Sequence, residues 1–190
     1  MGPPVSFRAS RVVWATLAAA LATHFEVPKL SAIVYAREND GLFLDKTLHS
    51  LQVAHDILLI NADNSDEIKR IGRRFHARVK SGIAGVTPGA YLMDAYHPWI
   101  LVLLPTEALS DEWSQSLKEW KRQKEDDNPG YSFDVLEQTE GAWRSRAAEL
   151  RLVDRRKINW TGDLPPNTDA PRVRGPLLRY EPRALEQNVA

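Results

Sequence analysis

Leu30–Ile60, with the sequence LSAIVYARENDGLFLDKTLHSLQVAHDILLI, decides the fold class. Its two ends, Leu30–Tyr35 and Ile57–Ile60, are short apolar runs of the kind found in buried strands. Between them, leucines recur at helical spacing and predict a helix over about residues 41–54. A strand, a helix and a second strand of these lengths predict a unit in which the two strands lie parallel.

The same alternation continues toward the C-terminus. Asn64 is expected to cap the next helix, with Glu67 as the partner acid three residues later. Ser110 is expected to cap a later helix that runs to about Lys121. Further strands are expected over residues 77–80, 99–104, 131–136 and 148–153, and a short helix over residues 91–96.

This alternation predicts the α/β class, with a Rossmann-like, mostly parallel central sheet flanked by helices. In such sheets ligands bind beyond the carboxyl ends of the strands. The residues that follow Tyr35, Ile60 and Leu104 are therefore the first candidates for a binding site.

Three segments are expected along the chain: an N-terminal helical extension (residues 1–29), an α/β domain (residues 30–162) and a Pro/Arg-rich C-terminal tail (residues 163–190). Within the first, Arg8 and Arg11 precede an apolar run, Val12–Ala22, that has the outline of a signal peptide but is too short to span a bilayer. A helix packed on the domain, or a start codon placed too far upstream, is the other interpretation of this run. The tail is expected either to be disordered or to wrap the domain.

The composition excludes several classes of protein. Lys plus Arg and Asp plus Glu are each 25, so the net charge is zero, which argues against a dedicated nucleic-acid binder. The chain has no cysteine, which rules out disulfides, zinc–thiolate sites and cysteine nucleophiles. That absence fits a cytoplasmic chain, and no integral membrane span is expected.

Three strand-ending segments carry a likeness to a known family: VYAREN (34–39), LINADNSD (59–66) and WILVLLPTE (99–107). A later segment, ELRLVDRRKINWTG (149–162), continues it. In their order and spacing these segments resemble family 2 glycosyltransferases, especially short bacterial enzymes that act on cell-envelope sugars. The resemblance covers roughly residues 30–162. It implies a GT-A type fold and a nucleotide-sugar donor.

The resemblance also implies site residues, and the chain departs from the family at three of them. The acid that contacts the nucleotide is replaced by Asn61. The two metal-binding acids of the Asp-x-Asp motif are replaced by Leu104 and Thr106, leaving Glu107 as one adjacent carboxylate. The implied nucleotide-sugar-binding residues are Ala36, Arg37, Glu38, Asn61, Asp63, Thr106 and Glu107.

Sugar transfer expels a nucleoside diphosphate, whose charge must be stabilised by a metal ion or by Arg and Lys. Mg²⁺ or Mn²⁺ could bind Glu107 only if waters and phosphates completed the site, so no metal-ligand set is predicted. The candidate cations are Arg37, Arg144, Arg146, Arg151, Arg155 and Arg156. The acids considered as the catalytic base are Asp134, Glu137 and Glu140, and spacing singles out none of them.

Two hypotheses of function follow. The chain is either a glycosyltransferase-like protein whose activity is weakened or lost, or a non-catalytic module of the same fold that binds a nucleotide, a glycan or a partner protein. The arrangement of Asn61, Asp63 and Glu107 discriminates between them, because transfer requires these side chains to converge on one cleft. Packing of Leu104 into a closed core would count against transfer.

Overall fold

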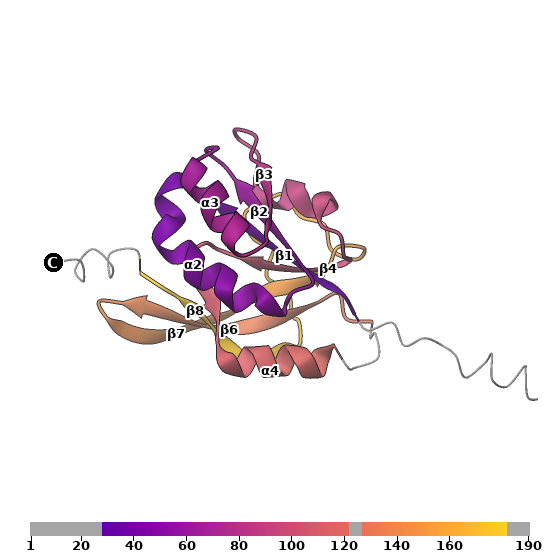
Figure 1. The fold of residues 1–190 in the computed structure, drawn as a ribbon. Coiled ribbons are helices and arrows are strands. Elements are labelled where there is room, and N and C mark those ends of the chain that lie inside the picture. Colours follow the sequence, from indigo (N-terminus) through magenta and orange to yellow (C-terminus); the bar gives the residue numbers. More distant parts are fainter. Residues whose placement is uncertain (1–27, 122–126, 182–190) are drawn as a thin grey trace, which may run out of the picture.

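The computed structural model describes residues 28–121 and 127–181. Within these ranges eight strands form one curled sheet in the order β3-β2-β1-β4-β7-β6-β8-β5 (Figure 1). The strands are β1 (Leu30–Ala36), β2 (Asp56–Asn61), β3 (Arg78–Ser81), β4 (Trp99–Leu103), β5 (Glu107–Leu109), β6 (Gly130–Thr139), β7 (Ala142–Asp154) and β8 (Arg172–Arg179). The helices are α2 (Gly41–Ser50), α3 (Asp66–Arg74) and α4 (Asp111–Trp120), with 3-10 helices η1 (Glu38–Asp40), η2 (Leu51–Val53) and η3 (Pro88–Asp94). The predicted α/β class is confirmed.

The expected mostly parallel sheet is found in only one half of the molecule. β3, β2, β1 and β4 pair in parallel, whereas β7 pairs antiparallel with both β4 and β6. β8 pairs parallel with β6 and antiparallel with β5. The change of direction has a local cause, because β6 and β7 are joined through Glu140 and Gly141, both of which have positive φ (53° and 77°). Two successive residues with positive φ form the tight turn that joins antiparallel strands.

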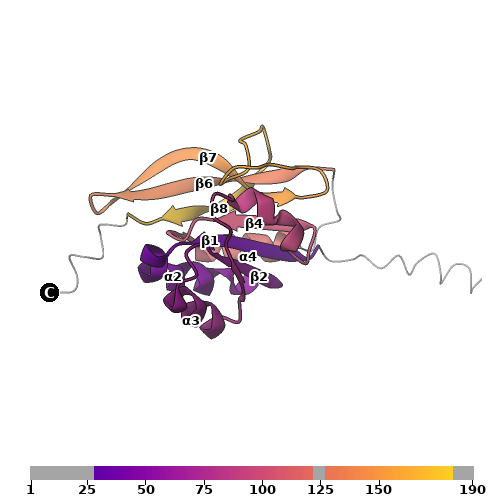
Figure 2. The same ribbon diagram turned by 90° about the horizontal axis from the view of Figure 1, so that it is seen from above.

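The α-helices that the structure describes cover only one face of the sheet. Leu30, Ala32 and Val34 of β1 point into an apolar core shared with α2, α3 and α4. The alternate residue Ile33 points into a second core, which is closed by η3 and by Trp160. Figure 2 shows β6, β7 and β8 on the opposite side of β1 and β4 from α2 and α3. The expected flanking by helices is therefore found on one face, and coil and η3 cover the other.

The two predicted helix caps have different outcomes. Ser110 is the N-cap of α4, and its side chain accepts a hydrogen bond from the Trp113 backbone N–H, as expected. Asn64 does not cap α3, because it has a φ of 57° and Ser65 is the N-cap residue. Asn64 instead occupies the left-handed position of the turn before the helix, which Asn tolerates better than most residues do.

The segment expected as a tail supplies a strand. Residues 172–179 form β8, which lies between β6 and β5, so the boundary after residue 162 does not coincide with an edge of the sheet. The signal-like run lies outside the described residues. No helix among the described residues is long and apolar enough to cross a membrane.

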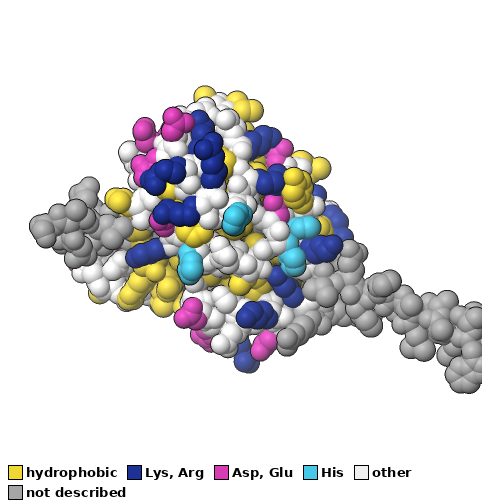
Figure 3. All heavy atoms as spheres, in the orientation of Figure 1, with side chains coloured by type: hydrophobic (Ala, Val, Ile, Leu, Met, Phe, Trp, Pro, Cys, Tyr) yellow, Lys and Arg dark blue, Asp and Glu magenta, His cyan; other side chains and the backbone are white. Residues whose placement is uncertain are grey.

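The surface over α2 and α3 has mixed charge. Lys and Arg side chains gather in the upper part of Figure 3, with Asp and Glu side chains among them. The ion pairs here are Lys69 with Asp66, Arg70 with Glu67, and Arg74 with Asp45. These basic side chains are thus interspersed with acids.

Candidate functional site

The carboxyl ends of β1 and β4 border a hollow of about 240 Å³. This is the edge of the sheet at which α/β proteins bind ligands. The hollow, which we call the strand-end hollow, is lined by Tyr35, Arg37, Asp40, Pro88, Val102, Leu103, Leu104, Pro105 and Asp163.

Arg37 is the cation of the strand-end hollow. It follows β1 directly, and its backbone N–H donates to Asp40 Oδ2 at 2.7 Å, which fixes the start of η1. The Arg37 side chain is exposed and forms no salt bridge with any residue that the structure describes. Burial raises the pKa of Asp40, partly offset by the hydrogen bond and the charge of Arg37. The hollow therefore offers one free guanidinium beside a half-buried carboxyl group.

The polar residues after β2 stabilise the chain's own turn. Asn61 is fully buried, and its Oδ1 accepts from the Ser65 N–H at 3.0 Å while its Nδ2 donates to the Ser65 carbonyl at 2.8 Å. Asp63 is exposed, and its Oδ2 accepts from the Glu38 N–H at 3.1 Å. Ala36 is buried at the end of β1. Asn61 thus has its amide engaged in the turn, while Asp63 and Glu38 lie together at its outer side.

Glu107 closes the turn between β4 and β5. It is fully buried, and its Oε2 accepts from the Leu104 N–H at 2.8 Å. The Glu107 N–H in turn donates to the Leu104 carbonyl at 3.0 Å. The Thr106 carbonyl accepts from the Tyr180 N–H at 2.9 Å, which anchors the turn to the end of β8. The carboxylate expected as a possible metal ligand is therefore part of a locked turn.

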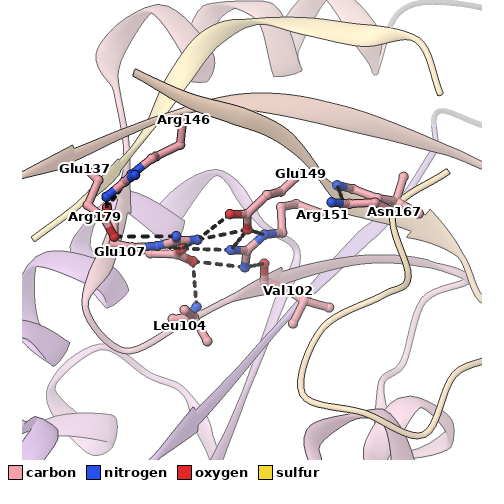
Figure 4. Close-up of polar contacts among 10 residues, drawn as sticks. Val102, Leu104, Glu107, Glu137, Arg146, Glu149, Arg151, Asn167 and Arg179 are labelled. Carbon is pink, nitrogen blue, oxygen red and sulfur yellow. Dashed lines mark hydrogen bonds and ion pairs between the residues drawn. The ribbon is translucent and has the colours of Figure 1, made fainter. Parts of the chain in front are cut away.

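Two arginines occupy the remaining lone pairs of Glu107 (Figure 4). Arg151 is also fully buried and donates to both oxygens, from Nη1 to Oε2 at 3.0 Å and from Nη2 to Oε1 at 2.8 Å. Arg179 Nε donates to Oε1 at 2.9 Å. Such a bidentate, charge-assisted arrangement is among the strongest that a carboxylate makes. No oxygen of Glu107 is left for a metal ion.

The ion pairs extend through Glu149. Its carboxylate accepts from Arg151 Nη2 at 2.5 Å and from Arg179 Nη2 at 2.8 Å. Burial acts to raise the pKa of Glu149, but the charges and hydrogen bonds of the two arginines lower it more, so it lies below its ordinary value. With Glu137, paired to Arg146 at 2.5 Å, these residues form a group of three acids and three arginines. We call it the arginine–glutamate cluster: Glu107, Glu137, Glu149, Arg146, Arg151 and Arg179.

The cluster lies beside a second and larger hollow of about 690 Å³. Leu104 lines both this hollow and the strand-end hollow, so the two meet at its side chain. Leu104 is half-buried and does not close the space by packing into the core. The second hollow, which we call the cluster hollow, is lined by Leu104, Glu137, Arg146, Ala147, Glu149, Leu164, Pro165, Asn167 and Arg179.

The donor set at these hollows does not fit Mg²⁺ or Mn²⁺, which prefer several carboxylate or carbonyl oxygens. Leu104 has no donor atom, Thr106 is neutral, and the Glu107 oxygens are engaged by arginines. No group of three or more His, Asp or Glu suited to a metal ion occurs among the residues that the structure describes.

The arginines expected as cations for the diphosphate do not converge on one site. Arg155 donates to the Leu92 and Ala95 carbonyls and so holds η3 in place. Arg156 pairs with Asp154, and Arg151 with Glu107. The exposed Arg144 and Arg146 lie on β7 and pair with Glu140 and Glu137, respectively. Arg37 is thus the candidate that combines exposure, a place in a hollow and a free guanidinium within the described part of the chain.

Four residues that the sequence did not indicate as cleft residues line the hollows: Asp40, Asp163, Glu149 and Arg179. Asp40 carries a usable signal, because an acid just after a strand can accept a hydrogen bond from the backbone N–H three residues earlier, here that of Arg37. Arg179 carried none, since its partners Glu107 and Glu149 are 72 and 30 residues away.

Comparison with known proteins adds little to this geometry. No protein-family model matches the chain, and no curated protein matches it. A solved structure described as 4-diphosphocytidyl-2C-methyl-D-erythritol synthase aligns over 77% of this chain and 90% of its own, with 16% identity and a TM-score of 0.49. At this identity and TM-score, the likeness supports no statement about function. Membership of the glycosyltransferase family stays a prediction.

Proposed function

We propose that this chain is a glycosyltransferase family 2-like protein that binds a nucleotide-sugar type of ligand in the strand-end hollow without a metal ion, its sugar transfer weakened or lost. The binding unit spans residues 30–181, because β8 belongs to the sheet. The ligand's phosphates lie at Arg37, and its sugar points past Leu104 toward the cluster hollow.

The single observation that carries the proposal is the state of Glu107. A metal-dependent transferase needs free carboxylate oxygens next to the pyrophosphate. Glu107 is the acid nearest to that position in the sequence, and it is fully buried and bonded to Arg151, Arg179 and the Leu104 N–H. Binding of an anionic ligand must then depend on a cation of the protein, and Arg37 is the free one in the hollow.

Weakened transfer is supported by the acids of the cluster hollow. An inverting transfer needs a base that can accept the proton of the acceptor hydroxyl, and a carboxylate works best in this role when its pKa is raised. The pKa of Glu149 is instead lowered by Arg151 and Arg179. Glu137 is engaged by Arg146. The acids that line the cluster hollow are thus bound to arginines.

A calorimetric titration tests the proposal. UDP-, GDP-, dTDP- and CMP-sugars are titrated in EDTA into the wild-type chain, into Arg37→Ala and into a control, Arg144→Ala. The control removes an exposed arginine from the far end of β7, outside the strand-end hollow. We expect one nucleotide class to bind in EDTA, and Arg37→Ala to weaken it about tenfold, the cost of one charge-assisted hydrogen bond.

Two results would overturn the proposal. The first is that no donor binds the wild-type chain with or without Mn²⁺. The second is that Arg37→Ala and Arg144→Ala bind as tightly as wild type, which would place the ligand elsewhere. The first result would favour the second candidate function, a module that binds a partner protein or a glycan and not a nucleotide.

A further inference from the structure

A third hollow, of about 300 Å³, lies at the ends of β6 and β8, and the proposed function does not use it. It shares Glu137 and Arg179 with the cluster hollow and no residue with the strand-end hollow. Its volume is at the lower end of the range for small-ligand sites. We call it the hairpin hollow, because the end of the β6–β7 hairpin forms one of its walls.

The charged groups of the hairpin hollow already have partners. Arg179 is bound by Glu107 and Glu149, and Glu137 pairs with Arg146. Glu181 Oε2 accepts from the Glu140 N–H at 2.8 Å. An ionic ligand would have to break one of these contacts to gain a new one, so the hollow has little to offer a charged group.

The neutral groups of the hairpin hollow are free. Thr106, Gln138 and Thr139 are half-buried and line it. Their side chains form no hydrogen bond with residues 28–121 or 127–181. Two hydroxyls and a carboxamide together supply several donors and acceptors. A ligand that carries both kinds of group can satisfy them in place of water, because it donates and accepts as water does.

An aromatic wall completes the hollow. Tyr180 lines it and is held by Phe43 (6.2 Å between ring centroids), by Trp143 (5.5 Å, edge to face) and by the Lys46 ammonium, 4.6 Å from the ring. Trp143 lies opposite Gln138 across the β6–β7 hairpin and is 44% exposed. Apolar side chains gather at the left of Figure 3, on the side where this hairpin ends in Figure 1. An exposed tryptophan ring thus stands beside unpaired neutral polar groups.

From this combination we infer that the hairpin hollow is a binding site for a neutral carbohydrate. Sugar hydroxyls both donate and accept, which matches Thr106, Gln138 and Thr139. The C–H face of a sugar ring is apolar and fits a flat aromatic surface such as Trp143. The compensated charges disfavour phosphorylated or acidic ligands. One ring sits in the hollow, and the rest of an oligosaccharide runs over the Trp143 side chain.

Acrylamide quenching of tryptophan fluorescence reports mainly on Trp143, because acrylamide quenches exposed tryptophans more strongly than buried ones. Trp99, Trp113, Trp120 and Trp160 are buried, and Trp143 is the exposed tryptophan among the described residues. The remaining tryptophan, Trp14, lies outside the described residues and is removed by Trp14→Phe in every variant. The full-length chain is titrated with neutral hexasaccharides of the malto-, cello-, xylo- and chito-series, and acrylamide quenching is measured at each point.

We expect one neutral series to saturate the signal and to protect the emission from acrylamide. Trp143→Ala should weaken binding about tenfold, measured by calorimetry, and Trp143→Phe should restore part of the loss because a flat ring returns. Gln138→Ala should weaken binding by a smaller factor. Arg37→Ala should leave it unchanged, which separates this site from the proposed nucleotide site.

Four results would overturn the inference. One is the absence of binding across a glycan array of neutral oligosaccharides. Another is tighter binding of an acidic series, such as oligogalacturonate, than of any neutral one. The third is wild-type affinity in Trp143→Ala, provided that circular dichroism shows the variant to be folded. A peptide that binds and protects Trp143 where no glycan does would mark the surface as a protein contact and would count against the inference in the same way.

Discussion

The two halves of the sheet use their polar residues in different ways. In the parallel half, β3-β2-β1-β4, polar side chains at the carboxyl ends of the strands bond to nearby backbone, as Asn61 does with Ser65. In the other half, β7-β6-β8-β5, charged side chains bond to one another across strands, as Glu107 does with Arg151 and Arg179. Loss of one local hydrogen bond lowers the free energy of unfolding by a limited amount. Loss of one member of a buried ion cluster lowers it more, because a charged partner is left buried without its counter-charge. Substitutions should therefore be felt unequally in the two halves.

The largest effect is expected for Glu107→Ala. The change leaves Arg151, which is fully buried, with a charge that Glu149 alone must compensate. Removal of one partner of a buried ion pair costs about 3–5 kcal/mol of unfolding free energy. Urea unfolding followed by circular dichroism measures this loss.

A double variant sharpens that test. Glu107→Leu combined with Arg151→Met replaces both charges by apolar groups of similar size, and we expect it to recover about 1 kcal/mol or more relative to Glu107→Ala. A loss below about 1 kcal/mol in Glu107→Ala itself would show that the cluster does not stabilise this half of the sheet.

A smaller effect is expected for Asn61→Ala in the parallel half. The variant removes two hydrogen bonds to Ser65 from a fully buried position, which costs about 1–3 kcal/mol. Asp63→Ala is the matched control, because Asp63 is exposed two residues away and should change stability by about 0.5 kcal/mol or less. Thermal and urea unfolding compare the two. Equal losses in both variants would contradict a structural role for the Asn61 amide.

A pH-dependent effect is expected from Asp56 at the start of β2. Burial acts to raise the pKa of Asp56. Hydrogen bonds from Arg78, the Tyr96 N–H and Ser31 lower this pKa by more than burial raises it, so it is lower in the folded than in the unfolded chain. Asp56 therefore stabilises the fold above its unfolded pKa of about 4, and this contribution is lost as the pH falls through the folded pKa. Unfolding free energies from pH 7 to pH 2 should fall less steeply in Asp56→Asn than in wild type. If the unfolding free energy fell equally steeply toward acid pH in both proteins, this expectation would be contradicted.

The smallest effect is expected for the surface of α3. Lys69 pairs with the fully exposed Asp66, and water and salt screen such a pair, so it contributes little to stability. Lys69→Ala should change the midpoint of urea unfolding little, and added salt should remove the remaining difference. A loss as large as that of Asn61→Ala would mean that exposed charge matters more in this half than buried local bonds.

The same contrast explains how much was predictable from the sequence. Apart from β5, the strands and α-helices between Leu30 and Trp120 follow from local periodicity, and the type and place of Ser110 mark it as a cap. β8 lies in a Pro/Arg-rich segment, and its place between β6 and β5 rests on pairing with distant residues that no local pattern reports. The β6–β7 hairpin depends on the Glu140–Gly141 turn, in which only the glycine is a local sign of positive φ.

The candidate site was predictable in its place and not in its details. The edge beyond β1 and β4 follows from the fold class, and Arg37 was named there in advance. Glu107 was expected as an available carboxylate, because its type fits a metal ligand as well as it fits an ion pair. Only the positions of Arg151 and Arg179, contributed by two other strands, decide between these roles.

The central claim is that Glu107 belongs to the ion cluster and that ligand binding does not depend on a metal ion. The most direct measurement is the calorimetric affinity of the best-bound nucleotide-sugar in EDTA and in Mn²⁺, for the wild-type chain and for Leu104→Asp combined with Thr106→Asp. We expect the wild-type affinity to be the same in both conditions and the double variant to gain Mn²⁺ dependence. A wild-type affinity that Mn²⁺ raises about tenfold or more, an effect abolished by Glu107→Gln, would contradict the claim.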